Sequence, residues 1–197
     1  MADEIYVVKR NGRGKEKLDI NKIHDMMQHA CEGISGVSSS QVQMTSGLQF
    51  ADGMSTDDIQ QILIRSASDL ISLDTPNYQY VAARLLLFSL RKSLFGRLWD
   101  HPKLSKQIDD GIAKGVYDPQ IREWYTESEI DRMDQWVDHE RDFLFTYAGL
   151  RQVFDKYLVQ DRSSGQIVEA PQLMYMLIAA TFFAHYPKEP RMNYVKR

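Results

Sequence analysis

The chain has 197 residues, of which 43% are hydrophobic and 11% are aromatic. This composition is typical of an ordered protein with a sizeable core and excludes a disordered chain. The formal net charge of −3 argues against a general nucleic-acid binder, because such domains are usually strongly basic.

A basic hairpin is predicted at the start of the chain. Alternating apolar and polar residues run up to Asn11-Gly12, a dipeptide that favours tight hairpin turns. Four cations crowd this turn: Lys9, Arg10, Arg13 and Lys15. They suit a phosphate ligand, but lysines on an exposed strand also discourage pairing between sheet edges. The residues alone leave both interpretations open.

A helix is predicted directly after the hairpin. Asp19 is a candidate N-cap, and apolar residues recur behind it at helical spacing. These are Ile23, Met26, Met27 and Ala30. Because free N–H groups at a helix N-terminus favour anions, the cations of the hairpin would complete a polyphosphate site there.

Cys31 is the single cysteine of the sequence, which excludes an internal disulfide and a cysteine-rich zinc site. Its place on the apolar side of the first helix favours a buried structural thiol over a nucleophile. The start of the chain lacks the pattern of a secretory signal, and the apolar run Leu173–Ala184 is too short to span a bilayer. We therefore expect a cytoplasmic protein with no membrane contact.

Two further helices are predicted before residue 97. After a break at residues 33–40 and a weak element at 41–50, Ser55 or Thr56 can cap an amphipathic helix. A helix at 78–95 is apolar almost all round and is therefore central to its domain. Gly96 ends it, and the composition changes beyond. We predict one domain at residues 1–96 and a second at 97–197.

The second region is predicted to be helical. Helices are expected at residues 104–113, 119–125, 128–137, 143–154, 171–186 and from 191 onward, with a short two-stranded ribbon formed by 157–159 and 166–168. The fold class is therefore mainly α. A small β-hairpin with helices precedes a helical domain that contains a short β-ribbon.

No catalytic or metal-binding constellation is evident in the sequence. The five histidines are scattered, and only Asp138-His139-Glu140 combines one with carboxylates. A solvated charged turn is the simpler interpretation of that tripeptide. We predict no catalytic residue and no metal ligand in this chain.

Several stretches, in order along the whole chain, resemble the N-terminal part of the large (alpha) subunit of class I ribonucleotide reductases. The first region, with Val8-Lys9-Arg10-Asn11-Gly12 and Asp19-Ile20-Asn21-Lys22-Ile23-His24, looks like an ATP-cone, the allosteric nucleotide module of that family. Further matching stretches are residues 67–72, 77–85, 156–160 and 194–197.

The resemblance implies that ATP or dATP, with or without Mg²⁺, binds as an allosteric effector. The residues that would contact it are Lys9, Glu16, Lys17, Leu18, Asp19, Ile20, Asn21, Lys22, Thr56 and Lys92. Lysine ammonium groups would meet the phosphates, and Thr56 would add a hydroxyl at a helix start.

Two positions depart from the pattern of the family. Gln60 and Ser89 stand where relatives carry histidines near the effector phosphates, and the hairpin turn is one residue longer. We therefore predict nucleotide binding with weak or absent inhibition by dATP.

The resemblance also implies that the catalytic barrel, its cysteines and its radical-transfer tyrosines would lie beyond Arg197. Alone, the chain would be inactive and would hold no redox cofactor. The favoured hypothesis is one piece of a split ribonucleoside-diphosphate reductase, a hetero-oligomer with a barrel-bearing chain and the radical-generating small (beta) subunit. The helices at 171–186 and 191–197 would form the seam. An independent nucleotide-sensing module and a non-catalytic fragment remain the alternatives.

Overall fold

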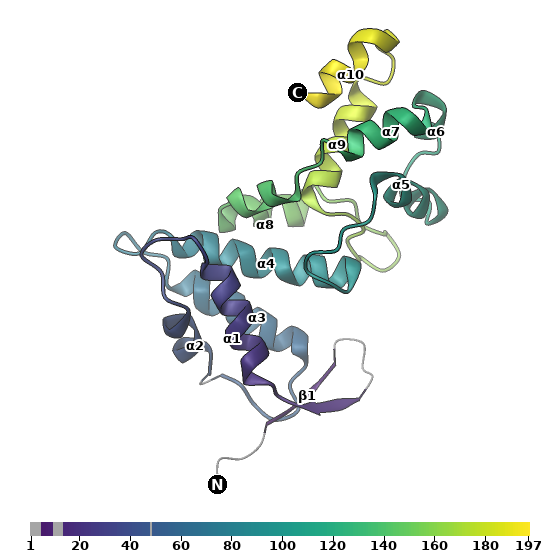
Figure 1. The fold of residues 1–197 in the computed structure, drawn as a ribbon. Helices are drawn as coiled ribbons and strands as arrows, with labels where there is room; N and C mark the ends of the chain where they lie inside the picture. The colour runs from purple at the N-terminus through teal and green to yellow at the C-terminus, as the bar shows by residue number, and fades with distance from the viewer. Residues whose placement is uncertain (1–4, 10–13, 48) are drawn as a thin grey trace. The chain divides into compact units, whose positions relative to one another are not determined.

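The computed structural model describes residues 5–9, 14–47 and 49–197 (Figure 1). The chain forms two compact units. The first comprises the residues up to Ser89 together with Phe143–Arg151, and the second comprises Leu90–Asp142 and Gln152–Arg197. The fold is mainly α, as predicted. A domain boundary at residues 96 and 97 stays a prediction.

The first unit begins with the predicted hairpin. Strands β1 (Tyr6–Val8) and β2 (Lys15–Lys17) pair antiparallel, with Tyr6 opposite Lys17. Gly14 takes a φ of 89°, a backbone conformation that glycine adopts without strain. The predicted turn at Asn11-Gly12, with Arg10 and Arg13, lies outside the described residues.

Four helices complete most of the first unit: α1 (Ile20–Cys31), α2 (Ser39–Gly47), α3 (Thr56–Asp69) and the greater part of α4 (Tyr78–Phe95). Helix α2 contacts both α1 and α3 (Figure 1). It begins within the serine run, so the predicted break between the first two helices is shorter than expected. Helix α4 is buried on several faces, through Val81, Leu85 and Phe88 among others, which confirms its central place.

Beyond α4 the chain forms α5 (Leu104–Ala113), α6 (Ile121–Trp124), α7 (Glu127–Asp134), the 3-10 helix η1 (His139–Leu144), α8 (Tyr147–Lys156), α9 (Pro171–Phe182) and α10 (Lys188–Lys196). The predicted bounds of α5 are confirmed. The expected helix at 191–197 begins three residues earlier, because Pro187 precedes its first turn as N-cap.

Several predictions for this region differ from the structure. Helices α6, α7 and α9 end before the predicted residues 125, 137 and 186. The single helix at 143–154 is interrupted, since the hydroxyl of Thr146 accepts a hydrogen bond from the N–H of Gly149 at 3.2 Å and starts α8 there. The ribbon is reduced to one antiparallel bridge between Gln160 and Ile167, supported by a bond from the N–H of Val168 to the carbonyl of Val159.

The core of the second unit gathers buried apolar side chains from α5, α6, α7, α9 and α10, including Leu104, Ile121, Ile130, Leu173 and Val195. A buried ion pair also lies inside this unit. The fully buried side chains of Arg91 and Asp142 form an ion pair of 3.1 Å. Within the described parts of the chain, no helix combines the length and the apolar character needed to cross a membrane.

Candidate nucleotide site and other cavities

Lys9, the first of the predicted site residues, directly follows β1. Its ammonium group lies 2.9 Å from the carboxylate of Glu16 on β2, and both side chains are partly exposed. The N–H of Lys9 donates to the carbonyl of Gly14 at 3.3 Å, which extends the hairpin pairing by one residue. The hairpin thus presents Lys9 and Glu16 together at its surface.

The chain passes from β2 directly into the N-terminus of α1. The side chain of Asp19 accepts a hydrogen bond from the N–H of Asn21 at 3.0 Å, which confirms Asp19 as the N-cap. Lys22 lies 3.9 Å from Asp19, and its side chain is 75% exposed. Ile20 is exposed as well. The predicted segment from Glu16 to Lys22 therefore lines one hairpin edge and the first turn of a helix.

The N-terminus of α3 lies beside the hairpin. Val8 forms a parallel bridge with Ser55, and the N–H of Val8 donates to the carbonyl of Met54 at 2.9 Å. Ser55 and Asp58 form a capping box that fixes the first turn of α3. Thr56 is the first helical residue, so the bridge places it on the segment next to β1, the strand that Lys9 directly follows.

These three features bring most of the predicted site residues together. Two helix N-termini, those of α1 and α3, adjoin one basic hairpin. A helix N-terminus carries partial positive charge and free N–H groups, which suit an anion such as a phosphate.

Lys92 is placed differently. It is exposed near the end of α4 and belongs to the second unit, whereas Lys9 and Thr56 belong to the first. Its assignment to the nucleotide site stays a prediction.

Gln60, one of the two positions that depart from the family pattern, is 7% exposed on α3. Its amide donates to the backbone carbonyl of Leu85 at 2.9 Å. The side chain therefore makes a buried structural bond between α3 and α4.

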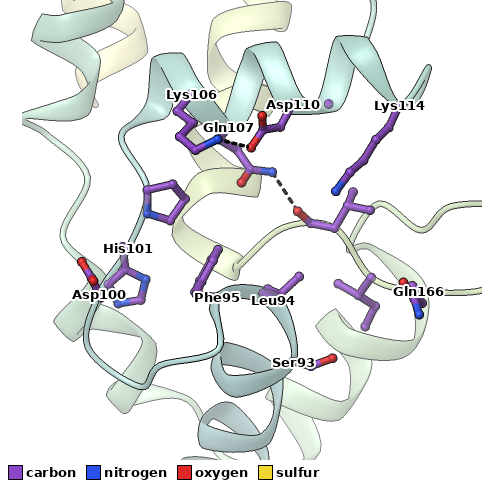
Figure 2. Close-up of a pocket in the computed structure, with 14 residues that line it drawn as sticks. Ser93, Leu94, Phe95, Asp100, His101, Lys106, Gln107, Asp110, Lys114 and Gln166 are labelled. Atoms are coloured by element: carbon purple, nitrogen blue, oxygen red, sulfur yellow. Dashed lines mark hydrogen bonds and ion pairs between the residues drawn. The ribbon is translucent and has the colours of Figure 1, made fainter. Parts of the chain in front are cut away.

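A hollow of about 450 Å³ in the second unit lies between α5, the end of α4 and residues 166–168 (Figure 2). Lys106 lies 2.8 Å from Asp110, and the amide of Gln107 donates to the carbonyl of Val168 at 2.8 Å. Because Lys106 pairs with Asp110 and Gln107 bonds to Val168, these side chains do not indicate a binding site for a charged ligand.

His101, on the wall of this hollow, stacks on His139 with 3.7 Å between ring centroids and 12° between planes. Burial lowers the pKa of His101 to about 3, with contributions from His139 and Arg91. Burial and then Arg91 lower the pKa of His139 to about 4, against the opposing charges of Asp134 and Asp138. The interpretation of residues 138–140 as a solvated turn is therefore wrong for His139, which is half-buried. Its partner lies 38 positions away, and no local pattern indicates the pair.

Cys31 is half-buried at the end of α1, and burial raises the pKa of its thiol. This agrees with a structural thiol, since a raised pKa lowers the fraction of reactive thiolate. Among the residues that the structure describes, no group of three His, Cys, Asp or Glu side chains could hold a metal ion.

Comparison with known families accounts for the hairpin and the helices behind it. Residues 5–93 match the model of the ATP cone domain. The first part of this chain thus matches the ATP-cone family. The matched residues include the β1–β2 hairpin, α1, α2, α3 and most of α4.

Individual proteins match this chain both within residues 5–93 and beyond them. The chain is 45% identical over 197 residues to ribonucleoside-diphosphate reductase 1 subunit alpha of Escherichia coli (strain K12) and to that of Salmonella typhimurium. It is 38% identical over 193 residues to the alpha subunit of Enterobacteria phage T4. The first two matches cover the whole of this chain and 26% of each relative. The ATP-cone and the region after it thus match the N-terminal region of reductase alpha subunits.

Proposed function

We propose that the ATP-cone of this chain binds ATP or dATP as an allosteric effector, at a site formed by Lys9, the segment 16–22, Thr56 and Lys92. The observation that carries the proposal is the bridge between Val8 and Ser55, because it joins the start of α3 to the basic hairpin.

The charges of the hairpin fit a phosphate ligand. Lys9 and Lys22 lie near carboxylates, those of Glu16 and Asp19, and all four side chains are at least 39% exposed. Exposed ion pairs of this kind contribute little to stability, so a polyphosphate can replace the carboxylates as partner of the ammonium groups. A charge-assisted hydrogen bond to phosphate contributes about 1.5–3 kcal/mol.

The response to dATP is proposed to be weak. Inhibition in the family is implied to involve histidines near the phosphates, and Gln60 occupies one of those positions. Its amide is bound to the carbonyl of Leu85. We therefore expect ATP and dATP to bind without dATP switching the activity off.

Isothermal titration calorimetry of the full chain with ATP and with dATP tests the site. The proposal expects measurable heat of binding for both nucleotides at micromolar to millimolar concentration. The absence of heat for both would overturn it.

We also propose that the chain supports deoxyribonucleotide synthesis in the cytoplasm, as part of a ribonucleoside-diphosphate reductase. The chain spans about a quarter of the length of the relatives that it matches. Its only cysteine is Cys31, in the ATP-cone, whereas the chemistry of the family needs a thiyl radical and a reducing cysteine pair. We propose that the catalytic groups come from a barrel-bearing chain and the radical from the small (beta) subunit.

Co-purification with such a chain tests this role. Reductase activity is expected only in the mixture of this chain, the barrel-bearing chain and the small subunit. The proposal would be contradicted if the barrel-bearing chain and the small subunit, without this chain, were active at the full rate and fully regulated by nucleotides. That outcome would favour an independent nucleotide-binding module or a non-catalytic fragment instead.

A further inference from the structure

Helix α9 exposes an apolar stripe. Tyr175, Ile178 and Phe182 are 44%, 53% and 72% exposed. Their spacing of three and four residues puts them on one face of the helix. The helix contains no charged residue, and its other face is buried in the core of the second unit. A helix that is apolar all round is normally buried on every side.

A groove of about 400 Å³ lies beside the stripe. Ile178 and Phe182 form part of one wall, and Tyr157, which is 57% exposed, lines the groove with them. Its lining is almost entirely apolar. A groove of this kind accepts apolar side chains of a partner.

The one carboxylate in the groove is already satisfied. Glu169 is 1% exposed, accepts a hydrogen bond from the hydroxyl of Tyr117 at 2.5 Å, and accepts another from the N–H of Val159 at 3.0 Å. Both of its oxygens are therefore engaged inside the protein, and most of the other side chains that line the groove are apolar.

The occupant is indicated by the neighbouring helix. Helix α10 packs against α9 through Met192 and Val195, and the rings of Phe183 and Tyr194 stack with centroids 5.4 Å apart. The matched relatives are about four times longer than this chain, and the match lies in their N-terminal region. In those relatives the polypeptide continues beyond the matched region, which ends at a helix packed against α9.

We propose that the stripe and groove on α9 are the docking surface for an apolar segment of the chain that carries the rest of the alpha subunit. This inference rests on the proposed function, and it goes further by assigning the contact to Tyr157, Tyr175, Ile178 and Phe182. Aromatic anchors of this type commonly dominate the affinity of an interface.

The test measures binding of the full chain to a defined probe, the portion of the Escherichia coli alpha subunit that follows the matched region, expressed as a separate chain. Wild type, Ile178→Asp and Phe182→Asp are compared with Met44→Asp, which changes a 76% exposed apolar residue in the first unit. Circular dichroism and the heat of ATP binding are recorded for each variant. These two readouts report on folding and on the nucleotide site independently of docking.

The expected result is at least a tenfold loss of affinity for Ile178→Asp and for Phe182→Asp, with Met44→Asp unchanged. ATP binding should be the same in all four proteins. Equal binding of all four to the probe would overturn the assigned surface while leaving the proposed function intact. Failure of the wild type to bind the probe would overturn the docking proposal. Self-association of the wild type that Phe182→Asp abolishes would overturn it as well. Absence of ATP binding in the wild type would contradict the nucleotide site alone.

Discussion

Val8 of β1 and Ser55 at the start of α3 form a parallel bridge, although 46 residues of sequence separate them. The bridge is extended by a hydrogen bond from the N–H of Gly53 to the carbonyl of Tyr6 at 2.8 Å. Segment 53–55 therefore runs along the outer edge of the hairpin. Through this pairing the helix N-terminus and the basic hairpin can act on one ligand.

Ser55→Ala is expected to weaken both the fold and the nucleotide site. The hydroxyl of Ser55 accepts from the N–H of Asp58 at 3.0 Å, and loss of such a cap costs about 1 kcal/mol of unfolding free energy. Because the same turn presents Thr56, ATP affinity should fall as well. Chemical denaturation and calorimetry measure the two effects.

A matched control for Ser55→Ala exists in the second unit. Thr126 forms the same kind of capping box with Glu129 at the start of α7. Thr126→Ala should lower stability by a similar amount and leave ATP affinity unchanged. If both variants lower ATP affinity equally, the start of α3 has no specific role.

Gly111→Ala is expected to destabilise the second unit. A β-carbon at position 111 would lie 2.0 Å from Cδ2 of Tyr117, so the ring would have to move. That movement would disturb the bond between Tyr117 and the buried Glu169. Overpacking of this kind typically costs about 1–3 kcal/mol.

Gly47→Ala is the control, because a β-carbon at position 47 of α2 would have no other atom within 4 Å. This change should be neutral or slightly stabilising, since alanine favours helices. Thermal denaturation of both variants is the measurement. An unchanged melting temperature for Gly111→Ala would show that Tyr117 can rotate away freely.

Asp142→Ala is expected to be strongly destabilising. Its carboxylate pairs with Arg91 at 3.1 Å and accepts from the amide of Gln172 at 3.0 Å, with both charged side chains fully buried. Removing one partner leaves a buried uncompensated charge, which typically costs about 3–5 kcal/mol. The double variant Arg91→Met with Asp142→Leu should recover part of the loss in urea denaturation. No recovery would mean that the cost comes from lost packing.

Stability should fall as the pH is lowered from about 6.5 to about 5. The folded-state pKa values of His101 and His139 are about 3 and about 4, below the ordinary value of about 6.5. In this window the unfolded chain takes up protons that the folded chain does not, so the unfolding free energy decreases with falling pH. The loss levels off once the pH passes below the folded-state values.

The double variant His101→Phe with His139→Phe keeps two stacked aromatic rings and removes the two imidazoles that take up protons. The slope of stability against pH between 6.5 and 5 should become smaller in this variant than in wild type. His185→Phe serves as the control for loss of a histidine. A slope that is unchanged in the double variant would assign the pH dependence to other groups.

Local signals predicted much of the fold. Asp19 and Ser55 are caps that act on their own helices, and the positions of α1 and α3 follow from them. The sequence does not predict the break before α8, although Thr146 is a capping residue, because the apolar pattern of residues 143–154 continues across it. The stacking of His101 on His139 depends on how distant segments pack, which no local pattern encodes.

In the candidate site, too, local sequence predicts the individual features, whereas their adjacency depends on the fold. The sequence identifies Lys9, the segment up to Lys22 and the helix start at Thr56 as separate features, and the family resemblance groups them. Their adjacency comes from the pairing of Val8 with Ser55, which depends on backbone hydrogen bonds between distant segments. The buried bond of Gln60 to Leu85 likewise appears only in the folded chain.

The most direct test of the nucleotide site is calorimetric titration of ATP into wild type, Lys9→Gln and Arg65→Gln. Arg65→Gln removes an exposed cation of α3 that was not assigned to the site. We predict that Lys9→Gln weakens ATP binding about tenfold or more, because a charge-assisted phosphate contact is lost, and that Arg65→Gln binds like wild type. Equal affinity of Lys9→Gln and wild type would rule out Lys9 as a phosphate ligand.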